Sequence, residues 1–223
     1  MNIQLLSIVD KHFNSNLGFG NDKSTAIELL KDTIQILDEF NIDYFLISGT
    51  LLGYIRHNDF IPWDDDIDLI VDHKILDKLQ EIHNKYNEKI TFINKQNFLL
   101  KTCLKKKIHK INNNHFNQYL LNKDDTYNWP FIDLFLFNYT NENKNKISFF
   151  KKEWDAHNFF PIKKTTFLNI NVSIPNNPEY FLKINYGDDY MTILKSSSWN
   201  HKDETSNKNM NTMTLEKYNF LRG

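Results

Sequence analysis

The sequence predicts a mixed α/β or α+β fold. Short apolar segments typical of buried strands alternate along the chain with segments whose apolar residues have helical spacing. The strand-like segments carry acidic residues at their ends or within them. The chain has 223 residues, of which 40% are hydrophobic and 14% aromatic. That length and composition predict a single domain over residues 1–223 with a sizeable core.

The N-terminal half begins with a predicted helix at residues 24–40, where Ile27, Leu30 and Ile34 share a face and Ser24 is a candidate N-cap. The segment before residue 42 is therefore expected to be helical. Further elements follow in order: a strand at 44–48, a short helix at 50–57, a strand at 66–71, a helix at 74–86, and strands at 90–93 and 98–104.

The C-terminal half opens with the apolar segment 131–137, which predicts another buried strand. Residues 147–158 are predicted to form a helix. The alternation in 167–174 predicts a strand with a hairpin partner. Two prolines and the segment ending at Gly187 predict a turn and a short helix. Residues 202–223 are expected to be a polar tail.

The charge balance excludes several classes of protein. Lys+Arg number 27 against 28 Asp+Glu, which gives a net charge of -1, so we expect no nucleic-acid partner. A single cysteine excludes an internal disulfide framework and a multi-cysteine zinc site. The first ten residues lack a basic n-region and no long apolar run exists, so we expect no signal peptide, no membrane span and a cytoplasmic protein.

Acidic residues are concentrated just before the predicted strand 66–71. In an extended chain Asp66 and Asp68 share one face, and Asp64 joins them if the strand begins early. Two carboxylates this close repel each other, and partial burial adds a desolvation cost. A divalent cation removes both problems, and ligands that are all oxygen favour Mg²⁺ or Mn²⁺.

Other interpretations of the aspartates are weaker or remain open. Taken alone, the run is equally consistent with a solvated loop, and a glycosyltransferase-type Asp-x-Asp metal site stays open. An EF-hand does not fit, because Leu69 stands where the calcium loop needs glycine and Ile75 where it needs glutamate.

The segment upstream favours a phosphate ligand. A strand, then Gly49-Thr50, then a helix is a phosphate-binding geometry, because glycine permits close approach and a helix start offers free N–H groups. Arg56 adds a forked donor for phosphate. The alternatives are an ordinary tight turn, a surface arginine, and a core or lid role for the neighbouring Trp63.

The third candidate carboxylate is Asp133, the one charge in the run WPFIDLFLF. A lone aspartate in such a strand is costly unless it is paired, hydrogen-bonded or bound to metal. Capping of a nearby loop is the structural alternative. Two carboxylates on one strand and a third on its neighbour form the arrangement that holds one or two Mg²⁺ ions for phosphoryl transfer.

Three segments resemble the LicD family of phosphocholine transferases and fukutin-related proteins. GTLLGYIRHNDFIPWDDDIDLIV resembles the family's hallmark segment, FIDLF at 131–135 its second acidic strand, and residues 159–191 its later block. The resemblance spans roughly 42–201. Two features depart from the family pattern: Leu136-Phe137-Asn138 follows FIDLF in place of Pro-Leu-Asp, and no double proline follows residue 191.

The resemblance implies a nucleotidyltransferase-like small mixed β-sheet flanked by helices. It implies Mg²⁺-dependent transfer of phosphocholine or a polyol phosphate from a CDP-linked donor to a glycan hydroxyl. Two other hypotheses remain: nucleotidylation from an NTP, and a non-catalytic binding module. The predicted site residues are Asp66, Asp68 and Asp133 for metal and catalysis, and Gly49, Thr50, Arg56, Trp63 and Asp64 for substrate.

Overall fold

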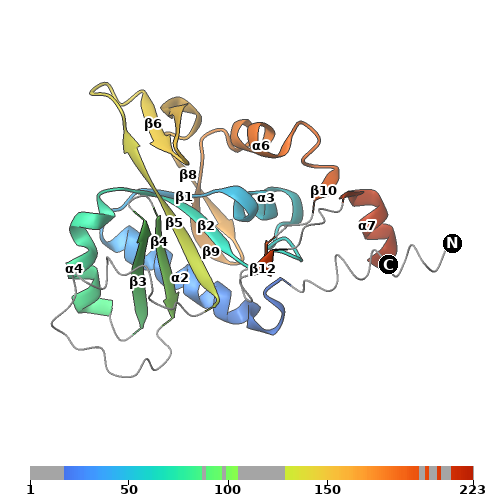
Figure 1. Ribbon diagram of the computed structural model, residues 1–223, viewed down its shortest axis with the longest axis horizontal. Coiled ribbons are helices and arrows are strands. Elements are labelled where there is room, and N and C mark those ends of the chain that lie inside the picture. Colours follow the sequence, from blue (N-terminus) through green and yellow to red (C-terminus); the bar gives the residue numbers. More distant parts are fainter. Residues whose placement is uncertain are drawn as a thin grey trace.

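The computed structural model describes residues 18–86, 89–96, 99–104, 129–195, 199–200, 205–206 and 212–222. Seven strands of this part form one mixed sheet with the path β1-β2-β5-β4-β3, extended by β6 and β7 beyond β5. Helices lie around the sheet, with α2 behind β3, β4 and β5 in the view of Figure 1. The predicted fold class, a mixed sheet flanked by helices, is confirmed.

Helices and strands alternate through the first half of the chain, much as predicted. The elements are η1 (Gly20–Asp22), α2 (Lys23–Glu39), β1 (Tyr44–Leu46), α3 (Ser48–His57), β2 (Ile67–Asp72), α4 (Ile75–Tyr86), β3 (Ile90–Gln96) and β4 (Leu99–Leu104). Two details differ. Helix α2 begins one residue before Ser24, and no side chain caps it. Helix α3 begins at Ser48, because the chain turns directly out of β1 there with a φ of 48°.

The second half supplies the remaining strands and two helices. They are β5 (Phe131–Tyr139), β6 (Lys146–Phe149), β7 (Lys152–Asp155), η3 (Ala156–Asn158), β8 (Lys163–Phe167), β9 (Ile170–Ile174), α6 (Pro178–Tyr186), β10 (Ile193–Lys195), β11 (Trp199–Asn200), β12 (Thr205–Ser206), β13 (Thr212–Thr214) and α7 (Leu215–Arg222). The helix ending before Gly187 is as predicted.

The centre of the sheet fixes the positions on which the site depends. Strands β2 and β5 are parallel, and Asp68 is the register partner of Asp133. Strand β4 is antiparallel to β5, and there Lys101 is the register partner of Asp133. These three residues therefore form one row across adjacent strands.

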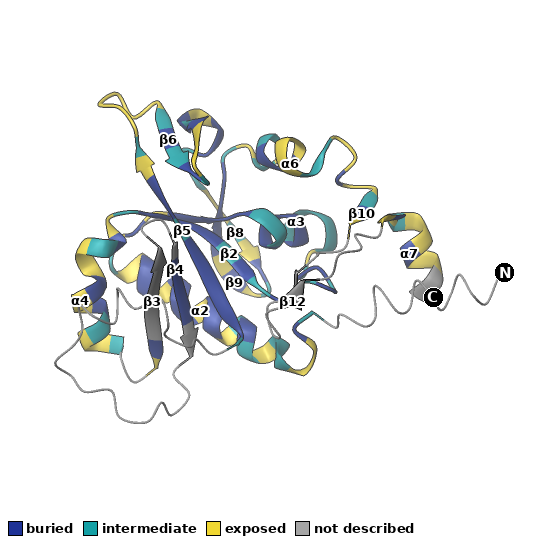
Figure 2. Ribbon diagram, in the orientation of Figure 1, coloured by how far each residue is buried: buried dark blue, intermediate teal, exposed yellow. Residues whose placement is uncertain are grey.

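The core lies around β2 and β5, which are mostly buried (Figure 2). Ile67 and Leu69, which alternate with Asp68 along β2, are fully buried. Helix α2 turns an apolar face of leucines and isoleucines inward, and its exposed residues lie on the opposite face. Because the Ile67 and Leu69 side chains face the core, the Asp68 side chain must lie on the opposite face of β2.

The predicted helix at 147–158 is wrong. The segment forms the hairpin β6–β7 followed by η3, and the turn between the strands places Phe150 and Lys151 at positive φ (52° and 57°). Packing decides the outcome, because the rings of Phe149 and Trp154 stack with centroids 5.2 Å apart in the aromatic core. The register places Trp154 opposite Ile147 and Phe149 opposite Lys152, so the two rings lie diagonally across one face of the hairpin.

Two further predictions need correction. The strand predicted at 167–174 starts only at Ile170, because Leu168 and Asn169 form the positive-φ turn between β8 and β9. The polar tail at 202–223 includes β13 and α7, and Tyr218 is buried because its ring packs against Trp63, with centroids 5.3 Å apart.

The domain assignment remains a prediction. Residues 1–17 of the predicted N-terminal helical segment lie outside the described residues. Within the described ranges, no helix has both the length and the apolar character needed to cross a lipid bilayer.

Candidate functional site

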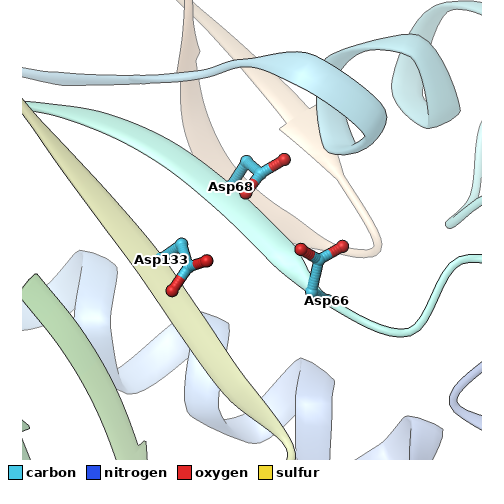
Figure 3. A group of neighbouring side chains, drawn as sticks. All are labelled: Asp66, Asp68 and Asp133. Atoms are coloured by element: carbon cyan, nitrogen blue, oxygen red, sulfur yellow. The ribbon is translucent and has the colours of Figure 1, made fainter. Parts of the chain in front are cut away.

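Three carboxylates converge at the start of β2. Asp68 lies in β2, Asp133 in the neighbouring strand β5, and Asp66 just before β2 begins. One oxygen from each lies within 4.8 Å of the others. Figure 3 shows the three side chains around a common space beside the two strands. The sequence placed Asp66 within the strand, whereas it belongs to the entering loop and still faces its partners.

The chemistry of this cluster fits a divalent cation. Burial, followed by the charges of Asp66 and Asp133, raises the pKa of Asp68 well above its ordinary value. Burial and like charge therefore both disfavour the ionised form of Asp68, and a bound cation would offset both. Carboxylate oxygens are the ligands that Mg²⁺ and Mn²⁺ prefer. These residues therefore fit the metal that the sequence predicted.

A buried lysine completes the row, and the sequence analysis missed it. The Lys101 ammonium lies 2.6 Å from Oδ1 of Asp133, and each side chain is only 10% exposed. The same ammonium lies 3.5 Å from the centroid of the Phe131 ring. Lys101 could have been recognised from the sequence, because it is a lone charge in the apolar strand LLKTCL, as Asp133 is in FIDLF.

Helix α3 positions Asp68 through Thr50. The Thr50 side chain is buried, and its Oγ1 accepts a hydrogen bond of 2.9 Å from the backbone N–H of Asp68. Thr50 was predicted to hold phosphate. Its hydroxyl instead joins the first turn of α3 to the acidic strand, and it lies outside the residues that line the pocket.

Gly49 leaves room for the Asp64 side chain. A Cβ at position 49 would collide with Oδ2 of the Asp64 carboxylate, which lies against the first turn of α3. Negative charge at a helix N-terminus is favourable. The predicted phosphate-binding turn therefore lies next to a carboxylate of the same chain, and Asp64 belongs to the site through this contact.

A pocket of about 510 Å³ opens beside Asp66 and Asp68. Its walls come from α3, the loop before β2, α6 and the segment after α6, which lie next to one another in Figure 1. Its volume is within the range of small-molecule sites. The lining residues are Ser48, Gly49, Leu52, Arg56, Ile61, Trp63, Asp64, Asp66, Asp68, Asn185, Tyr186, Tyr190, Ile193 and Lys195.

Arg56 brings positive charge to this pocket. Its Nη1 donates to the carbonyl of Tyr190 at 2.7 Å, and its Nε donates to Nε2 of His57 at 3.0 Å. Burial lowers the pKa of Arg56 to about 10, so it stays charged at neutral pH. Burial and the Arg56 charge lower the pKa of His57 to about 4, so His57 is neutral and accepts the hydrogen bond.

Two aromatic residues form part of the wall. Trp63 is 4% exposed, and its Nε1 donates to the carbonyl of Lys195 at 3.3 Å. Trp63 is thus held in the wall, in line with its interpretation as a core or lid residue. Tyr186 lies near the acidic cluster, and burial together with the charges of Asp68 and Asp64 raises the pKa of its phenol.

The fold and this site combine a mixed sheet, a helix entering after the first strand, and carboxylates from two adjacent parallel strands. The family model described as "LicD/FKTN/FKRP, nucleotidyltransferase domain" matches residues 41–177. The chain therefore belongs to the LicD family, as its sequence motifs predicted.

Individual relatives match parts of this region. A Rickettsia prowazekii protein is 28% identical over 179 residues, covering 78% of this chain and 59% of its own length. The lipopolysaccharide cholinephosphotransferase LicD of Haemophilus influenzae is 42% identical over 57 residues, which is 23% of this chain and 22% of LicD. The mouse ribitol 5-phosphate transferase FKRP is 23% identical over 167 residues, covering 72% of this chain and 31% of FKRP.

The chain thus spans less than two thirds of the length of these curated relatives. Among solved structures, a nucleotidyltransferase-like protein from Paracoccidioides brasiliensis aligns with a TM-score of 0.40 and 13% identity, covering 73% of this chain and 65% of that chain.

Proposed function

We propose that this protein is a Mg²⁺-dependent transferase that moves phosphocholine or a polyol phosphate from a CDP-linked donor to a glycan hydroxyl. The observation that carries the proposal is the cluster of Asp66, Asp68 and Asp133, with one oxygen of each within 4.8 Å of the others, beside a pocket of about 510 Å³. Membership of the LicD family supports the reaction class, because two relatives are transferases of cholinephosphate and ribitol 5-phosphate by name.

The acidic cluster would hold the metal. Asp66 and Asp68 are the expected ligands, and Asp133 completes the site as a ligand or as the base for the acceptor hydroxyl. A bound Mg²⁺ supplies charge neutralisation for the phosphates of the donor. Asp68 is kept in place by Thr50, which holds its backbone, and by the pairing of β2 with β5.

The pocket would bind and orient the donor. Arg56 keeps its charge and lies in the same pocket as Asp66 and Asp68, so it is the candidate for holding phosphate oxygens. Lys195 and Asn185 line the wall as further donors. Transfer of a phosphorylated alcohol depends mainly on positioning and charge stabilisation, and these side chains supply both.

A donor screen tests the proposal. Nucleoside-diphosphate alcohols are incubated with the protein, Mg²⁺ and candidate glycans, and CMP release and product formation are measured. We expect CMP release from a cytidine donor and its loss in Asp66→Asn. Pyrophosphate release from an NTP would instead favour nucleotidylation, and nucleotide binding without turnover would favour a binding module.

Calorimetry separates the two classes of alcohol. CDP-choline and CDP-ribitol share the base and the diphosphate, so a difference in affinity for the Mg²⁺-loaded protein reports on the alcohol pocket. Choline has a permanent cation and no hydrogen-bond donor on its ammonium, and aromatic or acidic groups bind it. Tyr186, Tyr190 and the aspartates line the pocket, which leads us to expect tighter binding of CDP-choline. Failure of both ligands together with tight binding of ATP or UTP would overturn the cytidine assignment.

A further inference from the structure

Lys101 sits at the end of a charged row that crosses the centre of the sheet. Asp68 on β2 pairs in register with Asp133 on β5, which pairs in register with Lys101 on β4. The row therefore runs carboxylate, carboxylate, ammonium on neighbouring strands. A lysine that is only 8% exposed is rare unless it is paired. Its partner here is a member of the acidic cluster.

The ion pair with Lys101 involves Oδ1 of the Asp133 carboxylate. The Lys101 ammonium lies 2.6 Å from Oδ1 of Asp133, and Oδ1 is shielded from solvent. The Phe131 ring, 3.5 Å from the same ammonium, provides a second favourable contact for the charge. Both contacts come from β5, so the ammonium is fixed by the strand that also presents Asp133.

We propose that Lys101 takes the place of a second metal ion, so that the site binds a single divalent cation. This inference rests on the proposed function, since it concerns the metal of that same site. Two-metal phosphoryl-transfer sites place their ions about 3.5–4 Å apart and share a carboxylate between them. In this protein the Lys101 ammonium already lies against Oδ1 of Asp133, so a second metal ion that shared this carboxylate would lie close to a buried positive charge.

Charge balance leads to the same result. Three ionised carboxylates carry three negative charges, Lys101 contributes one positive charge and a divalent cation two. One metal ion then balances these charges, and the nearby Asp64 and Arg56 add one charge of each sign. A second divalent ion would lie next to a buried ammonium, where like charges repel strongly at low dielectric. Lys101 is thus a positioning residue that sets the metal stoichiometry.

The test measures Mn²⁺ binding to the 223-residue chain. Binding is monitored by calorimetry and by the electron paramagnetic resonance signal of free Mn²⁺. We expect one Mn²⁺ per chain in the wild type. In Lys101→Met, which keeps the length of the side chain but removes its charge, we expect a second bound Mn²⁺ or at least tenfold tighter binding of the first. Lys101→Gln, which retains a hydrogen-bond donor, should behave in the same way and guards against misfolding of the methionine variant.

The chain offers a matched control. Lys89 forms a 2.7 Å ion pair with the buried Asp32, at a position that takes no part in the acidic cluster. Lys89→Met should leave Mn²⁺ stoichiometry and affinity unchanged. Circular dichroism and a melting curve for each variant show that it folds.

The outcomes separate the two proposals. Two Mn²⁺ ions per wild-type chain would overturn the role of Lys101 and leave the metal site intact. Unchanged or weaker Mn²⁺ binding in both folded Lys101 variants would do the same, because a purely structural ion pair would not tighten metal binding when removed. An absence of Mn²⁺ binding by the wild type would overturn the metal-dependent function itself, and this inference with it.

Discussion

Replacing Asp68 by asparagine should stabilise the metal-free protein while abolishing its metal binding. Asp68 is the member of the cluster whose pKa is raised by burial and by the charges of Asp66 and Asp133. Asparagine has nearly the same shape and no charge. The substitution therefore removes repulsion in the metal-free state and a ligand in the metal-bound state, so the two states should respond with opposite sign.

The magnitude follows from the geometry of the cluster. Its oxygens lie within 4.8 Å of one another, and two unit charges at that distance repel by about 3.5 kcal/mol at an effective dielectric constant of about 20. Lys101 offsets part of this repulsion. Uptake of a proton by Asp68 also limits the cost, because burial and the neighbouring carboxylates raise its pKa. We expect a gain of about 3 kcal/mol at pH 7, which is a rise in Tm of roughly 6–12 °C for a chain of this size.

The assay is thermal unfolding with chelator and with saturating Mg²⁺. Mg²⁺ should raise the Tm of the wild type and leave that of Asp68→Asn unchanged. The raised pKa also sets the sign of the pH dependence. The folded metal-free protein binds the Asp68 proton more tightly than the unfolded chain does. Its stability should therefore increase as the pH falls from neutral toward about 4, and the variant should lack this increase.

Asp72 provides the control on the same strand. It is also buried, but it pairs with Lys74 at 3.1 Å and accepts the Lys74 backbone N–H at 2.9 Å. Asp72→Asn should therefore lower the Tm slightly. If metal-free Asp68→Asn melted at or below the wild-type temperature while Asp72→Asn behaved as expected, the carboxylates would not repel one another in the folded protein, and the reasoning would be refuted.

Three other changes have defined outcomes. Gly49→Ala should alter donor binding more than Tm, because the new Cβ displaces the end of the Asp64 side chain, which lines the pocket. Calorimetry that finds unchanged CDP-choline affinity would contradict the role of this contact. Thr50→Val should lower the free energy of unfolding by about 1–3 kcal/mol, because the Asp68 N–H loses its acceptor, whereas Thr50→Ser should retain most of the stability in urea unfolding. The pKa of His57 is lowered to about 4 in the folded protein, so the unfolded chain takes up a proton first as the pH drops. Stability should therefore fall between about pH 6.5 and about pH 4. His57→Gln should remove this loss, and an unaltered pH profile of the Tm in the variant would show that His57 does not cause it.

Local patterns were sufficient where one element could be recognised on its own. The spacing of Ile27, Leu30 and Ile34 predicted helix α2 because one face of a helix must meet the core. The alternation of aspartate and apolar residues predicted β2 and the face that Asp68 occupies. Patterns failed at 147–158, where the segment forms a hairpin because β6 pairs with β5 and the rings of Phe149 and Trp154 pack into the aromatic core.

The sequence by itself predicted the family and the fold class, and both are confirmed. It also named the three aspartates that the structure brings together, because a carboxylate in or beside an apolar strand is costly unless it has a partner. Only the tertiary structure decided which groups meet. The register of β4 against β5 brings Lys101 to Asp133, and the packing of α3 brings Gly49 against Asp64 and gives the Thr50 hydroxyl to Asp68. These contacts join residues that are 15 to 32 positions apart or on different strands. Sequence spacing along one element does not report such contacts, because they depend on how separate elements pack together.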